Sequence, residues 1–318
     1  MQGTRAQRIG WLAVLSALLA PAAAAQTLFP RERAATSAPA SAPALPERAG
    51  AQVLAPGLAL DRMRGEVLVD GWICLTVGPL EYVACQAGKE HESVVRMRPS
   101  AAEVRRALVE LGAAPGAPPV WNAEREAFDP PSGDLLDVYV EYLRDGRLQR
   151  VNVWEWLIEL EYQRVPFERP WLFAGSREAA GELAADRSGG VIALVDDPNS
   201  LLALLGRRSE RAEELWVGVN TARVPVVGSA VRLVLSRARV RPVKWELDAR
   251  GDLRADDRWC SLRDAAERLE IERRAGRREI EIVVRRGGLR ADERRLRQWL
   301  EQVGLAEFVR VVGNAALP

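Results

Sequence analysis

Histidine is almost absent from this chain of 318 residues, because His91 is the only one. A site that needs two or more imidazole ligands is therefore excluded, including that of the H-E-x-x-H zinc hydrolases. Lysine is nearly as rare, since Lys89 and Lys244 are the only two. The 45 basic and 44 acidic residues leave a formal net charge of +1, so no overall field favours nucleic acid or an acidic membrane surface as a partner.

Cysteine is scarce as well, with Cys74, Cys85 and Cys260 only. An odd number permits at most one intrachain disulfide and leaves at least one free thiol. If residues 78–81 form a hairpin loop, Cys74 and Cys85 lie directly opposite one another and a cross-strand disulfide becomes possible. With a two-residue turn, Cys85 instead faces Trp72 and stays free. The sequence leaves both arrangements open.

Long apolar runs are missing after the N-terminus, where no stretch approaches the roughly 18 residues of a membrane span. The N-terminus itself carries two arginines, an apolar run over residues 9–19 and an A-x-A site ending at Ala25. This is the pattern of a cleavable secretory signal peptide. We therefore predict a signal peptide over residues 1–25, export to the periplasm or cell envelope, and no membrane span after cleavage. An uncleaved N-terminal anchor is the alternative.

The rest of the chain divides by composition and pattern. Residues 26–56 are rich in Ala, Pro and Ser and predict a flexible tether. Residues 57–208 contain several short β-type runs and one helix, opened by the S-x-x-E capping box of Ser100 and Glu103, and predict a β-rich domain.

Residues 209–318 contain predicted strands, the first over Val231–Leu235 and another over Glu279–Val284. They also contain a helix capped by Ser261 and an amphipathic helix over Asp292–Val303, which together predict a small α+β sandwich domain. The expected fold class is α+β, with a charge-dense linker at 206–214.

Several short motifs occur in order between residues 57 and 205. They include LEYVAC at Leu80–Cys85, KEHES at Lys89–Ser93, WLFAGS at Trp171–Ser176 and PNSLL at Pro198–Leu202. In these motifs the segment resembles the YdjY domain family of exported bacterial proteins. The resemblance implies no settled activity.

Members of that family are sometimes described as ferredoxin-like, which would imply an iron–sulfur cluster. Such a cluster normally takes four cysteine ligands. Only Cys74 and Cys85 lie in the segment, and with His91 the count reaches three. We therefore expect no iron–sulfur cluster.

The C-terminal part, about 240–313, resembles the periplasmic domain of the ExbD/TolR biopolymer-transport proteins. The likeness lies in WELD at Trp245–Asp248, GDL at Gly251–Leu253 and VGL at Val303–Leu305. Those proteins carry a transmembrane helix directly before this domain, and no such helix is predicted here. The resemblance therefore implies a fold only.

The segment that could carry chemistry joins Cys85 to His91, with five residues between them. A loop of this length can bring a thiol and an imidazole together, and a neighbouring imidazolium lowers a cysteine pKa. Three interpretations remain open: a structural role for both residues, a nucleophilic or redox thiol site, and a single metal ion held by Cys85, His91 and a carboxylate. Asp186 or Glu81 is the candidate to orient the imidazole.

Further candidate binding residues are Glu92 and Ser93 beside His91, Trp171 and Ser176 in the aromatic stretch, and Asp186. Aromatic clusters more often form a core than a ligand platform, because their side chains bury large areas. No phosphate-binding loop or G-x-S-x-G elbow occurs.

Because no catalytic set is complete, we expect a binding or assembly module of the periplasm or cell envelope, with another envelope protein as its partner and no resident cofactor beyond a possible single metal ion. The alternative is a cysteine- or metal-dependent redox or hydrolytic activity centred on Cys85 and His91. Whether the protein is an enzyme stays open.

Overall fold

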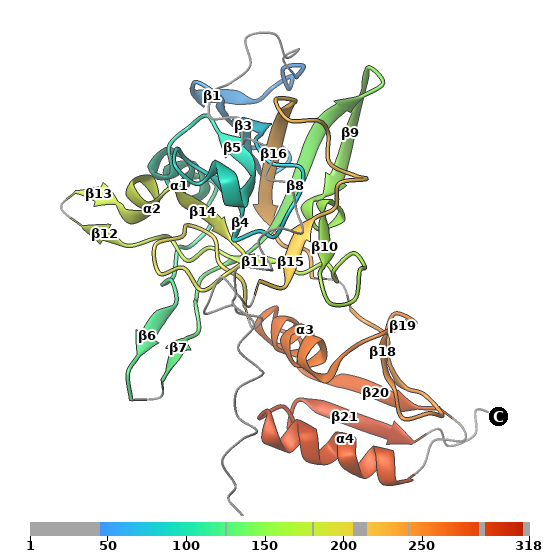
Figure 1. Cartoon of the computed structure of the whole chain (residues 1–318). Helices are drawn as coiled ribbons and strands as arrows, with labels where there is room; N and C mark the ends of the chain where they lie inside the picture. Colours follow the sequence, from blue (N-terminus) through green and yellow to red (C-terminus); the bar gives the residue numbers. More distant parts are fainter. Residues whose placement is uncertain are drawn as a thin grey trace, which may run out of the picture.

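The computed structural model describes residues 45–124, 126–179, 181–205, 215–240, 242–285 and 290–313. It consists of a large N-terminal sheet with two helices and a smaller C-terminal sheet with two helices (Figure 1). The predicted signal peptide, most of the predicted tether and the predicted linker lie outside the described residues. Across the described ranges, no helix combines the length and apolarity that a membrane crossing requires.

The large sheet has ten strands. Its main path runs β11 (Trp171–Leu172), β8 (Leu135–Arg144), β16 (Ala230–Arg237), β3 (Glu66–Ile73), β5 (Ser93–Met97), β4 (Tyr82–Cys85) and β14 (Gly190–Ala193). Strands β1 (Gln52–Ala55) and β2 (Leu58–Asp61) extend it beside β3, and β9 (Arg147–Asn152) pairs with β8. Only β4 and β5 run parallel to each other among these pairs.

Strand β16 lies at the centre of this sheet, between β3 and β8. Its Leu233 is opposite Val69 on one side and Val140 on the other. The run Val231–Leu235 is fully buried, as expected of a strand with both faces covered. The sequence pattern predicts this run as the first strand of the C-terminal part, whereas in the structure it belongs to the N-terminal sheet. The period and composition of a strand do not specify its partners, which here lie far upstream.

Helices α1 (Ala101–Glu110) and α2 (Ala184–Ser188) pack beside this sheet. The capping box predicted for α1 is present: Ser100 accepts from the Glu103 N–H, and the Glu103 carboxylate accepts from the Ser100 N–H. The apolar face of α1 packs on β2 and β3. The remaining N-terminal elements are the pairs β6 (Val120–Asn122) with β7 (Ala127–Asp129), β10 (Leu157–Glu159) with β15 (Val217–Val219) and β12 (Glu178–Ala179) with β13 (Glu182–Leu183), and the short helices η2 (Glu90–Glu92) and η3 (Val153–Trp156).

The smaller sheet has the order β19 (Arg258–Trp259), β18 (Leu253–Ala255), β17 (Trp245–Leu247), β20 (Ile280–Val284) and β21 (Val309–Gly313). Helices α3 (Leu262–Arg274) and α4 (Arg290–Gln302) accompany it, and Ser261 caps α3 as predicted. The β-rich α+β class is thus confirmed. A division into two independent domains stays a prediction.

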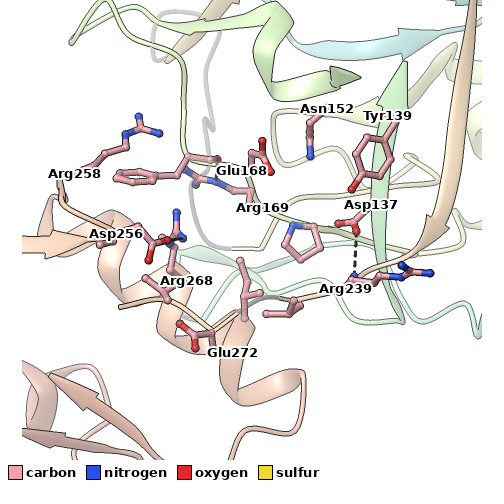
Figure 2. Close-up of a pocket in the computed structure, with 16 residues that line it drawn as sticks. Asp137, Tyr139, Asn152, Glu168, Arg169, Arg239, Asp256, Arg258, Arg268 and Glu272 are labelled. Atoms are coloured by element: carbon pink, nitrogen blue, oxygen red, sulfur yellow. Dashed lines mark hydrogen bonds and ion pairs between the residues drawn. The ribbon is translucent and has the colours of Figure 1, made fainter. Parts of the chain in front are cut away.

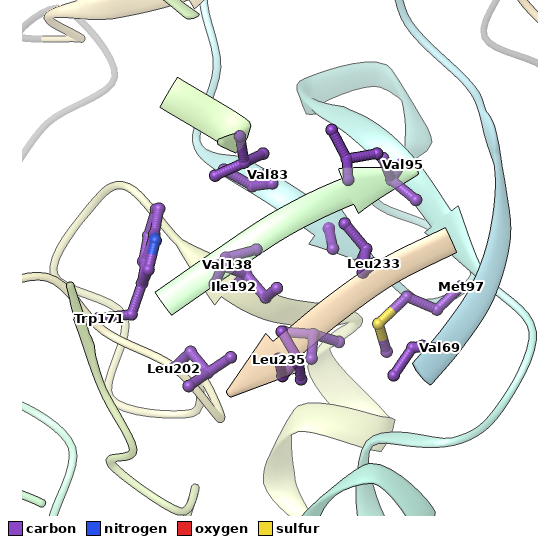
Figure 3. Packing of buried hydrophobic residues seen from close by; sticks show 14 of the residues in the cluster. Val69, Val83, Val95, Met97, Val138, Trp171, Ile192, Leu202, Leu233 and Leu235 are labelled. Carbon is purple, nitrogen blue, oxygen red and sulfur yellow. The ribbon is translucent and has the colours of Figure 1, made fainter. Parts of the chain in front are cut away.

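The core of the large sheet joins residues from widely separated parts of the chain, between Leu58 and Leu235 (Figure 3). Buried apolar side chains drive this assembly, at about 1.5–3 kcal/mol for each large residue removed from water. The side chains in view include Val69, Val83, Val95, Met97, Val138, Trp171, Ile192, Leu202, Leu233 and Leu235.

The predicted tether, 26–56, ends earlier than expected. Strand β1 falls within it, and the Arg48 side chain is only 13% exposed. Its guanidinium lies 2.5 Å from Glu66 and also pairs with Glu141. These two carboxylates are buried on strands β3 and β8. Because buried charges require partners, Arg48 is held against the sheet although its surroundings have the composition of a linker.

Replacing Arg48 by methionine is therefore expected to lower the free energy of unfolding by about 2 kcal/mol. The loss stays moderate because Arg150 still pairs with Glu66. Urea unfolding of the mature protein measures it. The control is Arg62→Met, whose exposed pair with Glu110 should contribute less than about 1 kcal/mol. Equal effects of the two substitutions would contradict a structural role for Arg48.

Candidate functional site

The motif KEHES and the start of LEYVAC lie next to each other in the fold. Residues Glu90–Glu92 form the short helix η2, and the Glu81 N–H donates to the Glu92 carbonyl at 3.1 Å. Strand β4 follows Glu81 directly and pairs in parallel with β5, which follows η2. This arrangement places the side chains of Glu81, Lys89 and Glu92 together at one end of both strands.

We define the motif cluster as Glu81, Tyr82, Lys89, His91, Glu92 and Asp197. Lys89 forms an ion pair with Glu92, and its Nζ lies 4.0 Å from Glu81 Oε2. His91 Nε2 lies 3.6 Å from Glu92 Oε2. The Glu92 side chain is 15% exposed, whereas that of His91 is 69% exposed. The cluster is thus half-buried, with the imidazole at its solvent side.

Asp197 and Tyr82 form the inner part of the motif cluster. Tyr82 Oη donates to Asp197 Oδ2 at 3.2 Å, and the Asn199 N–H donates to Asp197 Oδ1 at 2.9 Å. Lys89 Nζ lies 5.4 Å from the centroid of the Tyr82 ring. Both Tyr82 and Asp197 are buried. This part of the cluster is therefore fixed by the fold.

Gly190 on β14 makes room for this arrangement. A Cβ atom there would lie 2.4 Å from Tyr82 Cε1 and 2.8 Å from Asp197 Oδ2. No side chain fits into that space without moving the ring.

Negative charge exceeds positive charge in the motif cluster. Burial raises the pKa of the Glu81 carboxyl, and the neighbouring Glu92 raises it further against the opposing effect of Lys89. Burial also raises the pKa of Asp197, although hydrogen bonds from Asn199 and Tyr82 oppose this. Burial opposes the charging of Lys89, but Glu92 and Glu81 together raise its pKa. One ammonium thus faces three carboxyl groups, and the site favours an additional proton or cation.

A glutamine at position 81 tests this electrostatic balance. A carboxyl whose pKa is raised in the folded state makes its full contribution to stability when the pH is below its ordinary pKa, which is 4.5 for Glu81. That contribution is lost as the pH rises through the raised value. At neutral pH, Glu81→Gln should therefore be more stable than the wild type, by on the order of 0.5–1 kcal/mol.

Urea unfolding of both proteins between pH 4 and 8 measures this difference, which should shrink toward the acidic end. The matched control is Glu103→Gln, which keeps the capping box of α1 but removes a negative charge from the helix N-terminus, and should destabilise the protein by about 0.5 kcal/mol. A glutamine at position 81 that destabilises the protein at neutral pH would contradict the assignment.

Cys85 does not belong to the motif cluster. It is fully buried at the end of β4, and no described interaction joins it to His91. The two thiols of Cys74 and Cys85 instead contact each other: a hydrogen bond with Cys85 and burial raise the pKa of Cys74, whose Sγ also donates to the Ser93 carbonyl at 3.1 Å.

Neither the hairpin loop at residues 78–81 nor a two-residue turn connects Cys74 and Cys85 as neighbouring strands. Strand β5 lies between β3 and β4, so the two cysteines are not opposite each other on neighbouring strands. Both are free thiols in the structure, as is Cys260.

The other candidate residues have structural environments. Trp171 is buried and stacks on Trp154. Asp186 accepts the first N–H groups of α1. The Ser176 hydroxyl donates to the Asn199 carbonyl and accepts from the Ala185 N–H. Ser93 is fully buried. Of the predicted site residues, the structure therefore brings together His91 and Glu92, with Glu81 beside them.

Three members of the motif cluster were not predicted: Tyr82, Lys89 and Asp197. Tyr82 and Lys89 stand inside the two motifs quoted above, so their clustering was a usable signal. Asp197 lies far along the chain, and only its position directly before PNSLL sets it apart.

Across the described part of the chain, no three His, Cys, Asp or Glu side chains are grouped so that they could hold a metal ion.

The fold and the motif cluster define a β-rich protein with one large mixed sheet and an acidic, half-buried surface site at its edge. The family model of the YdjY domain matches residues 58–236, which is more than half of the chain. The protein therefore belongs to the YdjY domain family. The match ends within β16, in agreement with the place of that strand in the large sheet. No curated protein and no solved structure matches the chain significantly.

Proposed function

We propose that this protein is an exported binding module of the cell envelope that recognises a cationic group of its partner through the motif cluster. The observation that carries the proposal is the charge balance of the cluster. Glu81, Glu92 and Asp197 face the single ammonium of Lys89. A lysine, arginine or amine from a partner would supply the missing positive charge.

Export and the two-domain layout belong to the same proposal. The signal-peptide pattern supports export. The two sheets have largely separate apolar clusters, which supports two domains, although Phe167 and a small cluster of Leu172, Leu205 and Ile271 join them. Sequencing the N-terminus of the secreted chain tests the first point, because a mature protein beginning at Gln26 is expected. Limited proteolysis tests the second. Because β16 belongs to the large sheet, cleavage between the domains is expected between β16 and β17, at residues 238–244, and not in the linker predicted from the sequence.

The alternative of a thiol-dependent activity has little support, because all three cysteines are buried. Burial disfavours the thiolate, which is the reactive form. We therefore expect Ellman's reagent to label none of the thiols in the native protein and all three after unfolding in guanidinium. One thiol that reacts in the native protein faster than a free cysteine would restore the alternative.

Site-specific photo-crosslinking tests the binding proposal. A photoreactive amino acid replaces His91, whose side chain is 69% exposed at the cluster. The matched control position is Met63, which is 94% exposed and is not part of the cluster. In intact cells, discrete crosslinked products are expected from position 91 only. They should disappear when Glu81 and Glu92 are both replaced by glutamine. Equal products from both positions, or products that survive the double substitution, would refute the proposal.

A further inference from the structure

A second site lies between the two sheets, where side chains of β8 and β9 face α3 and the end of β18 (Figure 2). The cavity has a volume of about 300 Å³. Its lining includes the apolar residues Val240, Val243 and Ile271 and the arginines Arg169, Arg239, Arg258 and Arg268. We define the arginine pocket by this cavity. Its size is at the lower end of the range for small-ligand sites.

Two arginines of this pocket lack full neutralisation. The Arg268 side chain is 13% exposed, and its only ion pair among the described residues is with Asp256 at 3.9 Å. Arg258 donates to the Val165 carbonyl at 3.0 Å and has no ion pair within the described ranges. Burial lowers the pKa of both guanidinium groups. Arg258 is exposed, whereas Arg268 is largely buried. A buried cation without a close counter-ion is costly, so the pocket favours an anion beside Arg268.

Phe167 fixes the orientation of both guanidinium groups. The Cζ atom of Arg258 lies 4.2 Å from the centroid of its ring, and that of Arg268 lies 4.7 Å away. Phe167 itself is buried. Stacking on an aromatic ring holds a guanidinium plane in place and leaves its N–H groups available for a carboxylate or phosphate. The two arginines are therefore preorganised.

Apart from Asp256, the acidic side chains of the pocket form no ion pair with Arg258 or Arg268 among the described residues. Glu272 accepts hydrogen bonds from Trp245 and Arg277. Asp137 accepts the backbone N–H of Arg239. Glu168 is exposed at the edge. Glu272 nevertheless raises the pKa of Arg268 through its charge, against the larger lowering by burial, so the positive charge of the pocket is only partly balanced.

We propose that the arginine pocket binds a small organic anion, whose carboxylate or phosphate lies between Arg258 and Arg268 and whose apolar part contacts Val243 and Ile271. This site involves no residue of the motif cluster. It would give the protein a ligand of its own in addition to an envelope partner.

Calorimetric titration of the mature chain tests the proposal with three probes that share an aromatic ring. Phenyl phosphate and phenylacetate carry the two kinds of anion, and benzyl alcohol is the neutral control. We expect saturable binding of at least one anion and none of the alcohol. The stronger anion distinguishes a phosphate ligand from a carboxylate ligand.

Two variants locate the binding. Arg268→Gln should weaken binding of the preferred anion about 10- to 100-fold, the usual effect of losing one charged hydrogen-bond partner. Arg258→Gln, at an exposed position, should weaken it similarly and guards against a folding defect in the first variant. The matched control, Arg263→Gln, changes an exposed arginine of α3 outside the pocket and should leave affinity unchanged.

Three outcomes would overturn the proposal. They are the absence of saturable binding of either anion, binding of benzyl alcohol as tight as that of the anions, and equal losses in the Arg263 and Arg258 variants. None of these outcomes bears on crosslinking at position 91, so the arginine pocket and the motif cluster succeed or fail separately.

Discussion

Replacing Trp171 by alanine is expected to lower the free energy of unfolding by about 3–5 kcal/mol. The indole is fully buried, and its ring stacks on Trp154 with centroids 5.2 Å apart and planes inclined by 13°. Trp171 also pairs with Leu136 across β11 and β8. Alanine would leave a cavity in the centre of the large core, because the surrounding strands cannot close around it.

Two further variants separate packing from polar interactions at this position. The Trp171 indole N–H has no hydrogen-bond partner among the described residues. Phenylalanine removes this unsatisfied donor and keeps most of the stacking, so Trp171→Phe should cost less than about 1.5 kcal/mol. Trp121→Ala changes a tryptophan that is 49% exposed on β6 and should cost about 1 kcal/mol or less.

Guanidinium unfolding of the three variants provides the measurement. The result decides between the two interpretations of Trp171 that the sequence left open. A core residue loses stability in proportion to its burial, whereas a ligand platform is tolerant of truncation. Unchanged stability of Trp171→Ala would therefore support the ligand platform and contradict the packing described above.

The sequence predicted local features well. The capping box at Ser100 and the N-cap at Ser261 each depend on a partner only three positions further along the sequence. Strand β20 and helix α4 were also expected within two residues of their observed bounds. In each case the deciding interactions are short-range or follow from the periodicity of apolar residues.

Long-range pairings were not predictable in this way. The run at β16 has the right composition for a strand, but nothing in it specifies β3 and β8 as its neighbours. The position of β5 between β3 and β4 was not predictable either. It excludes a hairpin between the two cysteines, although their thiols still contact each other. Loop length alone suggested that Cys85 approaches His91, whereas strand alternation and burial place the thiol inside the fold.

The motif cluster combines both kinds of information. Lys89, His91 and Glu92 are close because they are close in sequence, and Asp197 reaches them only through the pairing of β14 with β4. Gly190, at the start of β14, is the residue on which the approach of Asp197 to Tyr82 depends most directly.

Replacing Gly190 by alanine is expected to destabilise the protein by more than about 3 kcal/mol and to separate Tyr82 from Asp197. The new Cβ would overlap the Tyr82 ring, with 2.4 Å to Cε1 and 2.7 Å to Cζ. The ring is buried and cannot move toward solvent without opening β4. Urea unfolding measures the loss, and the ultraviolet absorbance of Tyr82 on alkaline titration reports its release. The pKa of this tyrosine, raised by burial, should fall toward its ordinary value.

A control and a second substitution make the cause of this loss testable. Gly313→Ala adds a methyl group to an exposed position on β21 where nothing lies within 4 Å, and should change stability by about 0.5 kcal/mol or less. In a Tyr82→Ala background, Gly190→Ala should cost at least about 2 kcal/mol less than in the wild type, since the ring that it strikes is gone. If the cost is the same in both backgrounds, the overlap with Tyr82 is not its cause, and Gly190 does not make room for the motif cluster.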